Sequence, residues 1–289
     1  MLYGAPSLPP IVDEGWLVAN RDRLVLADVR WFMDGRDARA SYRAAHLPGA
    51  IFVDVDRDLA GPPSRTAGRH PLPDPADFAA SMSRLGIADH HLVIAYDQGN
   101  GGYAARLVWM LRVTGREAAV LDGGIGTWSG SVDAGEVARP PARFTARSWP
   151  AEWLATTAEV EEAAADTATI LVDARAAQRY RGEVEPVDPR AGHVPTAVNL
   201  PFVDNVDAQG RLRPDDELRA SLEAVGVTSA DDVIVYCGSG VTACQDLLVM
   251  ERLGIHGRLY PGSWSQWSGD PDRPIAVGPT PGAWEPATA

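Results

Sequence analysis

The feature that most constrains the fold of this chain is an internal repeat. Four blocks of similar sequence occur twice, in the same order, with the second occurrence 139 to 147 residues after the first. The blocks are LVLADVRW at 24–31 and TILVDARA at 169–176, AHLPGAIFVD at 45–54 and GHVPTAVNLP at 192–201, LGIADHHLVIAYD at 85–97 and VGVTSADDVIVYC at 225–237, and LDGGIGTW at 121–128 and YPGSWSQW at 260–267. Because chance does not preserve such an order, the sequence predicts a tandem duplication of a domain of about 130 residues.

Each copy alternates short apolar runs with helical patterns. The runs LVLADV, LVIAY, ILVDA and VIVYC have the length and composition of strands that are buried on both faces. Residues 101–115 and 241–254 have helical spacing and end on Gly115 and Gly254, a residue type that suits the position after a helix. The alternation predicts an α/β fold of two domains, each a mainly parallel sheet flanked by helices.

The junction between the copies is predicted from proline positions. Prolines punctuate residues 136–155, a stretch without clear periodicity. We therefore expect an N-terminal domain at 1–138, a linker at 139–155 and a C-terminal domain at 156–289.

The two copies differ at one informative position. The run VIAYD ends on Asp97, whereas the run VIVYC ends on Cys237. An aspartate is a poor equivalent for a core cysteine, because burying an unpaired charge is costly. This comparison predicts an exposed strand end at both positions, with a chemically active cysteine in the second copy only.

The loop after Cys237 contains only small or β-branched side chains. Residues 238–242 read GSGVT and lead into the predicted helix. Such a loop can turn its backbone N–H groups inward at a helix N-terminus, which stabilises an anion at the centre. Thiolate is the nucleophilic form of cysteine, so the loop is suited to a reactive Cys237.

The second copy resembles the rhodanese domain, and its loop CGSGVTAC is similar to that of the 3-mercaptopyruvate sulfurtransferases in this family. The HLPGA and DGG…W elements of the first copy match the broader family pattern, so the resemblance covers nearly the whole chain. It implies an inactive N-terminal copy, with Asp97, and an active C-terminal copy, with Cys237. It also implies that the cysteine takes sulfur from a donor, becomes a persulfide and passes the sulfur to a thiol or to cyanide.

The resemblance also bears on the donor. Family members that prefer thiosulfate carry basic side chains after the cysteine, whereas this chain has Gly238 and Ser239 there. All 26 basic residues of the chain are arginine, so cationic contacts to a substrate must come from guanidinium groups. The resemblance therefore implies 3-mercaptopyruvate as donor, with release of pyruvate, and thiosulfate as the alternative.

Residues 177–195, AQRYRGEVEPVDPRAGHVP, resemble the family's substrate-binding stretch. Arg179 matches the arginine that holds the donor carboxylate, and a guanidinium can bind a carboxylate through two parallel hydrogen bonds. Arg190 is favoured as a second arginine, and Arg181 competes with it. The loop residues that the resemblance places around the donor are Gly238, Gly240, Val241 and Thr242.

A Ser-His-Asp arrangement is implied for members that use mercaptopyruvate. Ser239 matches it in the loop, and His70 in GRHPLP and Asp56 in FVDVD match it in the first copy. A histidine oriented by a carboxylate can tune a serine hydroxyl for proton transfer. If they act there, the first copy contributes groups to the site of the second; the alternative is that Asp56 and His70 are ordinary loop residues.

Two other residue types have simpler expected roles. His46 and His193 occur in both copies, so we expect each to form hydrogen bonds within its own repeat. Cys244 lies seven residues after Cys237, and we expect it to pack in the core rather than to form a disulfide.

Two further function classes remain as alternatives. Cysteine phosphatases share this type of fold, but they need an arginine six residues after the cysteine, where this chain has Ala243. A regulatory rhodanese module or persulfide carrier would fit a copy with Asp97 alone, whereas Cys237 together with Arg179 favours turnover.

Composition limits the partners. A formal charge of −13 argues against nucleic acid or an anionic membrane as the main partner. The expected partners are a small-molecule sulfur donor and a thiol acceptor, for which a thioredoxin-like protein is a candidate. The sequence has two cysteines, no Cys/His cluster with metal-ligand spacing and no secretion signal, so we expect no metal or cofactor and a cytoplasmic location.

Overall fold

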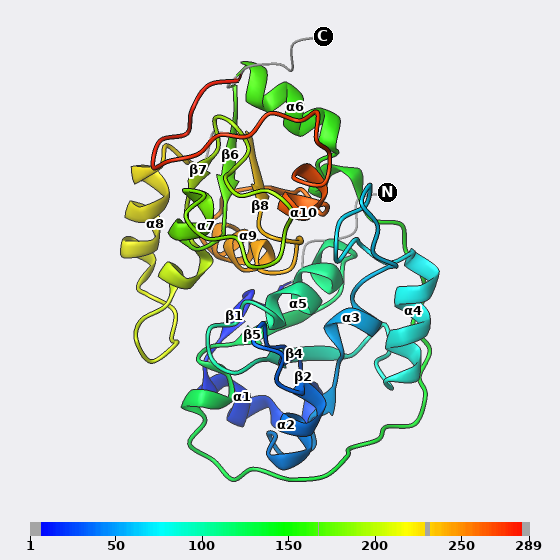
Figure 1. The fold of residues 1–289 in the computed structure, drawn as a ribbon. Coiled ribbons are helices and arrows are strands. Elements are labelled where there is room, and N and C mark those ends of the chain that lie inside the picture. The colour runs from blue at the N-terminus through cyan, green and yellow to red at the C-terminus, as the bar shows by residue number, and fades with distance from the viewer. Residues whose placement is uncertain (1–6, 167, 229–231, 285–289) are drawn as a thin grey trace. The chain divides into compact units, whose positions relative to one another are not determined.

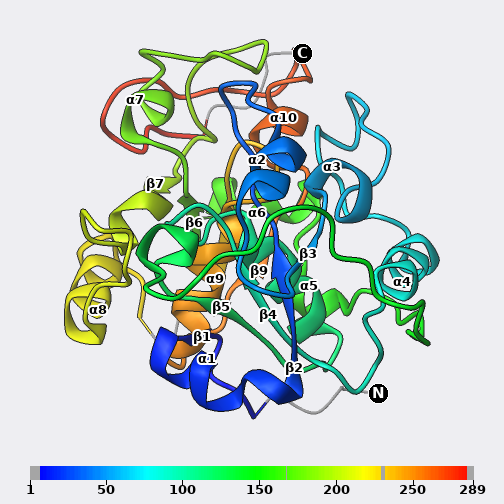
Figure 2. The same cartoon turned by 90° about the horizontal axis from the view of Figure 1, so that it is seen from below.

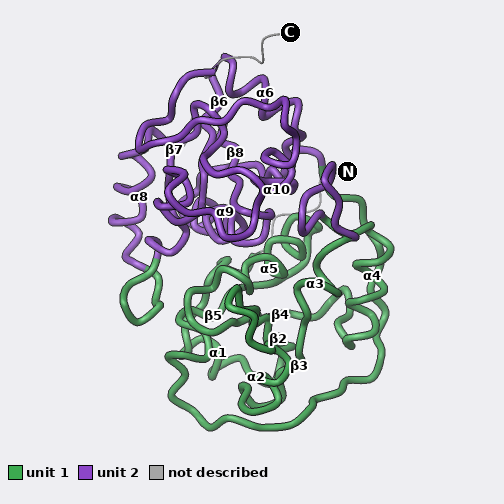
Figure 3. Tube along the Cα trace, viewed as in Figure 1, with its two compact units in different colours: residues 1–61, 72–150, 206–212 green, residues 62–71, 151–205, 213–289 purple. Residues whose placement is uncertain are grey.

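The computed structural model describes residues 7–166, 168–228 and 232–284. Residues 229–231 of the repeat block at 225–237, and residues 1–6 at the N-terminus, lie outside the described residues. The chain forms two compact units (Figures 1 and 3). The first unit contains residues 1–61, 72–150 and 206–212, and the second contains residues 62–71, 151–205 and 213–289.

The first unit is built on a five-stranded sheet in which all neighbouring strands are parallel. The strand order is β1-β5-β4-β2-β3, and the longest pairing runs from Leu24 opposite Leu92 to Asp28 opposite Tyr96. The strands are β1 (Ile11–Val12), β2 (Leu24–Asp28), β3 (Ile51–Phe52), β4 (Leu92–Tyr96) and β5 (Ala118–Leu121). The helices are α1 (Glu14–Asn20), η1 (Arg21–Arg23), α2 (Ala38–Ala44), α3 (Val55–Asp58), α4 (Pro75–Arg84), α5 (Ala104–Val113) and η2 (Gly124–Thr127).

The second unit repeats this plan with a four-stranded parallel sheet in the order β7-β6-β8-β9 (Figures 1 and 2). A single parallel bridge from Leu154 to Leu259 takes the place that β1 has in the first unit. The strands are β6 (Thr169–Asp173), β7 (Val198–Asn199), β8 (Asp232–Tyr236) and β9 (Arg258–Leu259). The helices are η3 (Ala151–Trp153), α6 (Thr157–Asp166), α7 (Ala177–Tyr180), η4 (Phe202–Asn205), α8 (Asp215–Ala224), α9 (Ala243–Arg252) and α10 (Ser263–Trp267).

These elements confirm the predicted α/β class. The four predicted strands correspond to β2, β4, β6 and β8, and the two predicted helices to α5 and α9. Gly115 and Gly254 have φ angles of 71° and 75°, which is the left-handed conformation that ends a helix at low cost for glycine.

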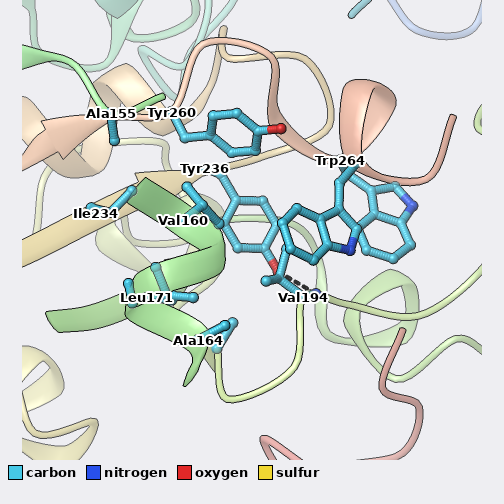
Figure 4. Packing of buried hydrophobic residues seen from close by; sticks show 12 residues of the cluster. Ala155, Val160, Ala164, Leu171, Val194, Ile234, Tyr236, Tyr260 and Trp264 are labelled. Carbon is cyan, nitrogen blue, oxygen red and sulfur yellow. Dashed lines mark hydrogen bonds between the residues drawn. The ribbon is translucent and has the colours of Figure 1, made fainter. Parts of the chain in front are cut away.

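Aromatic side chains fill one face of the second sheet. Tyr236 on β8, Tyr260 after β9 and Trp264 on α10 are at most 1% exposed, and they pack with aliphatic residues of α6 and β6 (Figure 4). The Tyr236 hydroxyl accepts a hydrogen bond from the backbone N–H of Val194 at 3.1 Å. This packing holds α10 against the sheet beside the carboxyl end of β8, where Cys237 follows.

The repeat extends to buried polar groups. His46 Nδ1 lies 3.0 Å from the Tyr42 carbonyl oxygen, and His193 Nδ1 lies 2.8 Å from the Tyr180 carbonyl oxygen. Both histidines are fully buried. The predicted hydrogen-bonding role of these histidines within each repeat is confirmed.

Candidate active site

Cys237 directly follows β8 and is held by its backbone on both sides. Its N–H donates to Ser263 Oγ at 3.1 Å, and its carbonyl oxygen accepts the Trp264 N–H at 3.0 Å. The Gly240 N–H points at Cys237 Sγ with a distance of 3.2 Å. The loop therefore directs at least one backbone donor at the sulfur, which favours negative charge there.

Burial corrects the prediction of an exposed strand end. Cys237 and Asp97 are each only 1% exposed. In the first unit, Asp97 Oδ1 accepts the N–H groups of Gly99 and Gly101 at 2.9 Å, and Oδ2 accepts those of Tyr103 and Ala104 at 2.9 and 3.3 Å. The prediction was wrong because it treated the aspartate as unpaired, whereas four backbone donors compensate its charge.

The first-unit loop is direct evidence that this turn can hold an anion. Six residues separate Asp97 from the start of α5, and five separate Cys237 from the start of α9, so the second loop is one residue shorter. Gly101 and Gly240 share the same left-handed backbone, with φ of 76° and 77°. A Cβ at Gly240 would lie 2.5 Å from the Pro261 carbonyl oxygen, so glycine is required there.

All the predicted loop residues lie at this turn. The residues Gly238, Ser239, Gly240 and Val241 are buried, and Thr242 is partly buried immediately before α9. Cys244, in the first turn of α9, is fully buried and donates to the Gly240 carbonyl oxygen at 3.4 Å. Both cysteines are free, which confirms the prediction that Cys244 packs in the core.

Ser263 is a loop support that the sequence analysis missed. It is fully buried, with a φ of 50°, and it occupies the place of Gly124, which has a φ of 54°, in the first copy. Its hydroxyl donates to the Tyr260 carbonyl oxygen at 2.9 Å while accepting from the Cys237 N–H. The only available signal was a serine aligned with a glycine of the repeat.

His70 and Ser239 are brought together. His70 Nδ1 lies 2.7 Å from Ser239 Oγ, and both side chains are buried, with exposed fractions of 8% and 6%. His70 comes from the 62–71 segment, which belongs to the second unit despite its early position in the chain. The segment is anchored by α10, since the Arg69 N–H donates to Ser265 Oγ at 3.0 Å.

Asp56 belongs to the first unit, on α3. Its carboxylate accepts the indole N–H of Trp31, also in the first unit, at 3.2 Å. Its action on His70 stays a prediction.

Arg179, on α7, lies in a cluster of charged side chains. Its Nη2 atom donates to Glu185 Oε1 at 2.6 Å and to Asp188 Oδ2 at 3.1 Å. Arg69 reaches the same Asp188 through Nη1 at 2.6 Å. A methyl group placed on Gly238 would lie 3.2 Å from Arg69 Nη2 and 3.3 Å from Arg179 Nη1, so both guanidinium groups border the cysteine loop.

Arg69 and Asp188 were not singled out from the sequence. Both lie close in sequence to predicted site residues, because Arg69 directly precedes His70 and Asp188 lies two residues before Arg190. Their convergence depends on the 62–71 segment joining the second unit, which the repeat pattern does not reveal.

The two candidates for a second arginine lie in different surroundings. The Arg190 guanidinium donates to backbone carbonyl oxygens at the end of α10 and just after it, those of Trp267, Ser268, Asp270, Pro271 and Arg273. Arg181 forms an ion pair with the exposed Glu183 at 2.7 Å. Contact of either residue with a donor carboxylate stays a prediction.

Asp246 is a buried acid on α9 that the sequence analysis also missed. It is 1% exposed, and its Oδ1 accepts from Asn205 Nδ2 at 2.5 Å, while Oδ2 has no hydrogen-bond partner among the described residues. Burial raises the pKa of Asp246 well above the ordinary range, the Asn205 hydrogen bond opposes this rise, and the electrostatic interaction with Cys237 adds to it. The helix that follows the cysteine loop therefore contains a buried acid that holds its proton more strongly than an exposed aspartic acid does.

Within residues 7–166, 168–228 and 232–284, no group of three or more His, Cys, Asp or Glu side chains could hold a metal ion. No described helix has the length and apolar character that crossing a bilayer requires.

Comparison with known proteins agrees with the geometry. The family model of the rhodanese-like domain matches residues 14–131 and 156–270. A probable 3-mercaptopyruvate sulfurtransferase of Pseudomonas aeruginosa is 39% identical over 270 residues, covering 90% of this chain and 94% of the relative. SseB of Mycobacterium tuberculosis, a putative thiosulfate sulfurtransferase, is 38% identical over 269 residues, covering 91% and 94%. The crystal structure of SseA of Escherichia coli, a 3-mercaptopyruvate sulfotransferase, matches with a TM-score of 0.78 at 32% identity, covering 89% of this chain and 99% of that chain.

Proposed function

Because this chain belongs to the rhodanese family and is a sulfurtransferase, we propose that it moves sulfur from 3-mercaptopyruvate through a persulfide on Cys237. The domain that carries this chemistry is proposed to span residues 156–289, after an inactive domain at 1–138 and a linker at 139–155.

The first half-reaction transfers one sulfur atom. The Cys237 thiolate attacks the thiol sulfur of 3-mercaptopyruvate, an S–S bond forms and the C–S bond breaks. The electron pair of the broken bond leaves on pyruvate as an enolate, which takes a proton. In the second half-reaction, an acceptor thiolate attacks the outer sulfur and Cys237 leaves as a thiolate.

The single observation that carries the choice of donor is the hydrogen bond between His70 Nδ1 and Ser239 Oγ, two residues after Cys237. A pyruvate enolate needs a proton as it leaves, whereas the sulfite that leaves thiosulfate is already a stable anion. A buried hydroxyl that is hydrogen-bonded to an imidazole can transfer a proton to a leaving group. It therefore favours the mercaptopyruvate reaction.

The remaining residues hold the donor and the sulfur. We assign Arg179 to the donor carboxylate, because its guanidinium borders Gly238, next to the reacting thiol. The loop of Gly238, Gly240, Val241 and Thr242 surrounds the sulfur, with the Gly240 N–H directed at it. Arg190 is retained as a candidate second contact, and Asp56 as the residue that orients His70.

The acceptor is proposed to be a thiol, either a small molecule or a thioredoxin-like protein in the cytoplasm, and no metal or organic cofactor enters these steps. Cyanide would also accept the sulfur, since it attacks the outer sulfur in the same way.

Thiosulfate is the second candidate donor, favoured by the similarity to the putative thiosulfate sulfurtransferase of Mycobacterium tuberculosis. The test is a steady-state comparison of both donors with the same acceptor. We expect kcat/KM to be higher for 3-mercaptopyruvate, and a higher kcat/KM for thiosulfate would contradict the proposal. A Cys237→Ser variant that still released pyruvate would contradict the mechanism as a whole.

A further inference from the structure

The Asp188 carboxylate joins two arginines beside the cysteine loop. It accepts hydrogen bonds from Arg69 Nη1 at 2.6 Å and from Arg179 Nη2 at 3.1 Å. The Asp188 side chain is 3% exposed, whereas those of Arg69 and Arg179 are 30% and 12% exposed. The carboxylate is thus enclosed, while both guanidinium groups are partly accessible from solvent.

This arrangement lies next to the nucleophile. A methyl group on Gly238 would meet Arg69 Nη2 at 3.2 Å and Arg179 Nη1 at 3.3 Å, and Gly238 directly follows Cys237. The nitrogen atoms nearest Gly238 are Arg69 Nη2 and Arg179 Nη1, whereas Arg69 Nη1 and Arg179 Nη2 donate to Asp188. An anion near the thiol can therefore meet both arginines while Asp188 is still bound to them.

The charges of the cluster cancel. Arg69 and Arg179 carry two positive charges, and Asp188 and Glu185, which bonds Arg179 at 2.6 Å, carry two negative charges. Arg175 also contacts Glu185, but it forms its own buried pair with Asp173. A donor anion therefore finds directional N–H groups without an excess of positive charge.

We propose that Asp188 is a specificity-determining residue whose carboxylate neutralises the Arg69–Arg179 pair, so that a donor with one negative charge is accepted and a donor with two is disfavoured. The inference rests on the proposed function, because it concerns the donor site of Cys237. Coulomb energy scales with the charge of the donor, so the negative charge of Asp188 disfavours thiosulfate twice as strongly as it disfavours the monoanion of 3-mercaptopyruvate.

The test is the Asp188→Asn variant, which keeps the shape of the side chain and removes its charge. We expect the KM for 3-mercaptopyruvate to fall about tenfold and the KM for thiosulfate about 100-fold, since the energy doubles for the dianion. The matched control is Asp216→Asn, which removes an exposed carboxylate on α8 and should leave both KM values unchanged.

A second variant, Arg69→Gln, tests the proposal independently in case Asp188→Asn folds poorly. Arg69→Gln removes a positive charge from the same pair, so the KM for thiosulfate should rise more than the KM for 3-mercaptopyruvate. Equal changes in the two KM values in either variant would overturn the proposal, because a residue that only holds Arg179 in place acts on both donors alike.

The role of Asp188 can be tested separately from the proposed function. Calorimetric Kd values of pyruvate and thiosulfate for Cys237→Ser, with and without Asp188→Asn, test the charge effect without turnover. A wild-type enzyme that does not use 3-mercaptopyruvate contradicts the proposed function alone. Unchanged Kd values for both anions contradict the role of Asp188 alone.

Discussion

The Nδ1 atom of His70 lies 2.7 Å from the Oγ atom of Ser239, although 169 positions separate the two residues in the chain. Ser239 is two residues after Cys237 in the loop that follows β8, and His70 enters the second unit with the 62–71 segment. The hydroxyl is therefore oriented by a buried imidazole, which gives the loop a group able to move a proton.

Removing the Ser239 hydroxyl or its histidine partner should lower turnover of 3-mercaptopyruvate much more than turnover of thiosulfate. We expect Ser239→Ala and His70→Asn each to lower kcat with 3-mercaptopyruvate by roughly 100-fold, because positioned acid–base groups typically contribute at least that much. Turnover of thiosulfate should change far less, since sulfite leaves without a proton. Steady-state kinetics with both donors gives the answer, with Ser221→Ala on α8 as the control, and equal losses for the two donors would refute the proton-transfer role.

Asp56 can be tested by its coupling to His70. If Asp56 acts through the imidazole, Asp56→Asn should lower kcat in the wild-type protein and have little further effect in the His70→Asn background. The measurement is a double-mutant cycle on kcat with 3-mercaptopyruvate. Fully additive effects would show that Asp56 acts independently of His70.

The two arginines of the substrate-binding stretch should respond differently to lysine. Arg179→Lys keeps the charge but loses the planar fork, so we expect KM for 3-mercaptopyruvate to rise about tenfold with little change in Tm. Arg190→Lys loses hydrogen bonds to the carbonyl oxygens after α10, so we expect a lower Tm.

A rise in KM for Arg190→Lys at unchanged Tm would instead identify Arg190 as a donor contact. Arg181→Lys is the control, because Arg181 pairs with Glu183 at the surface and an exposed pair of this kind contributes little.

The raised pKa of the buried Asp246 leads us to expect that the free energy of unfolding depends on pH. Burial raises its pKa in the folded protein, so below the unfolded value of about 3.9 both forms carry the proton and the group has no effect. As the pH rises above that value, the unfolded chain releases the proton while the folded protein keeps it. Folding then loses up to about 1.4 kcal/mol per pH unit until the folded pKa is reached.

Asp246→Asn removes this loss without changing the size of the side chain. Its Tm relative to the wild type should therefore increase from pH 5 to pH 8, whatever constant offset the buried amide adds. Thermal unfolding of both proteins at several pH values measures the difference. A constant difference across that range would show that Asp246 titrates normally.

The sequence predicted the parts of the site that depend on local pattern. The repeat located β8 and its thiol, because the strand–loop–helix unit recurs with Asp97 in place of Cys237. The prediction that Asp97 and Cys237 are exposed was wrong. The groups that compensate the Asp97 carboxylate are backbone N–H groups, and the types of the residues in the loop do not show how these groups are oriented. Arg69, Asp188 and Ser263 were missed because their roles depend on contacts between distant segments and on one left-handed serine.

The most direct test of the central claim is the mass of the protein after reaction with 3-mercaptopyruvate in the absence of any acceptor. The account predicts the addition of one sulfur atom, located on Cys237 by peptide mapping, absent from Cys237→Ser and retained in Cys244→Ser. Sulfur on Cys244, or pyruvate release with no sulfur on Cys237, would contradict the account.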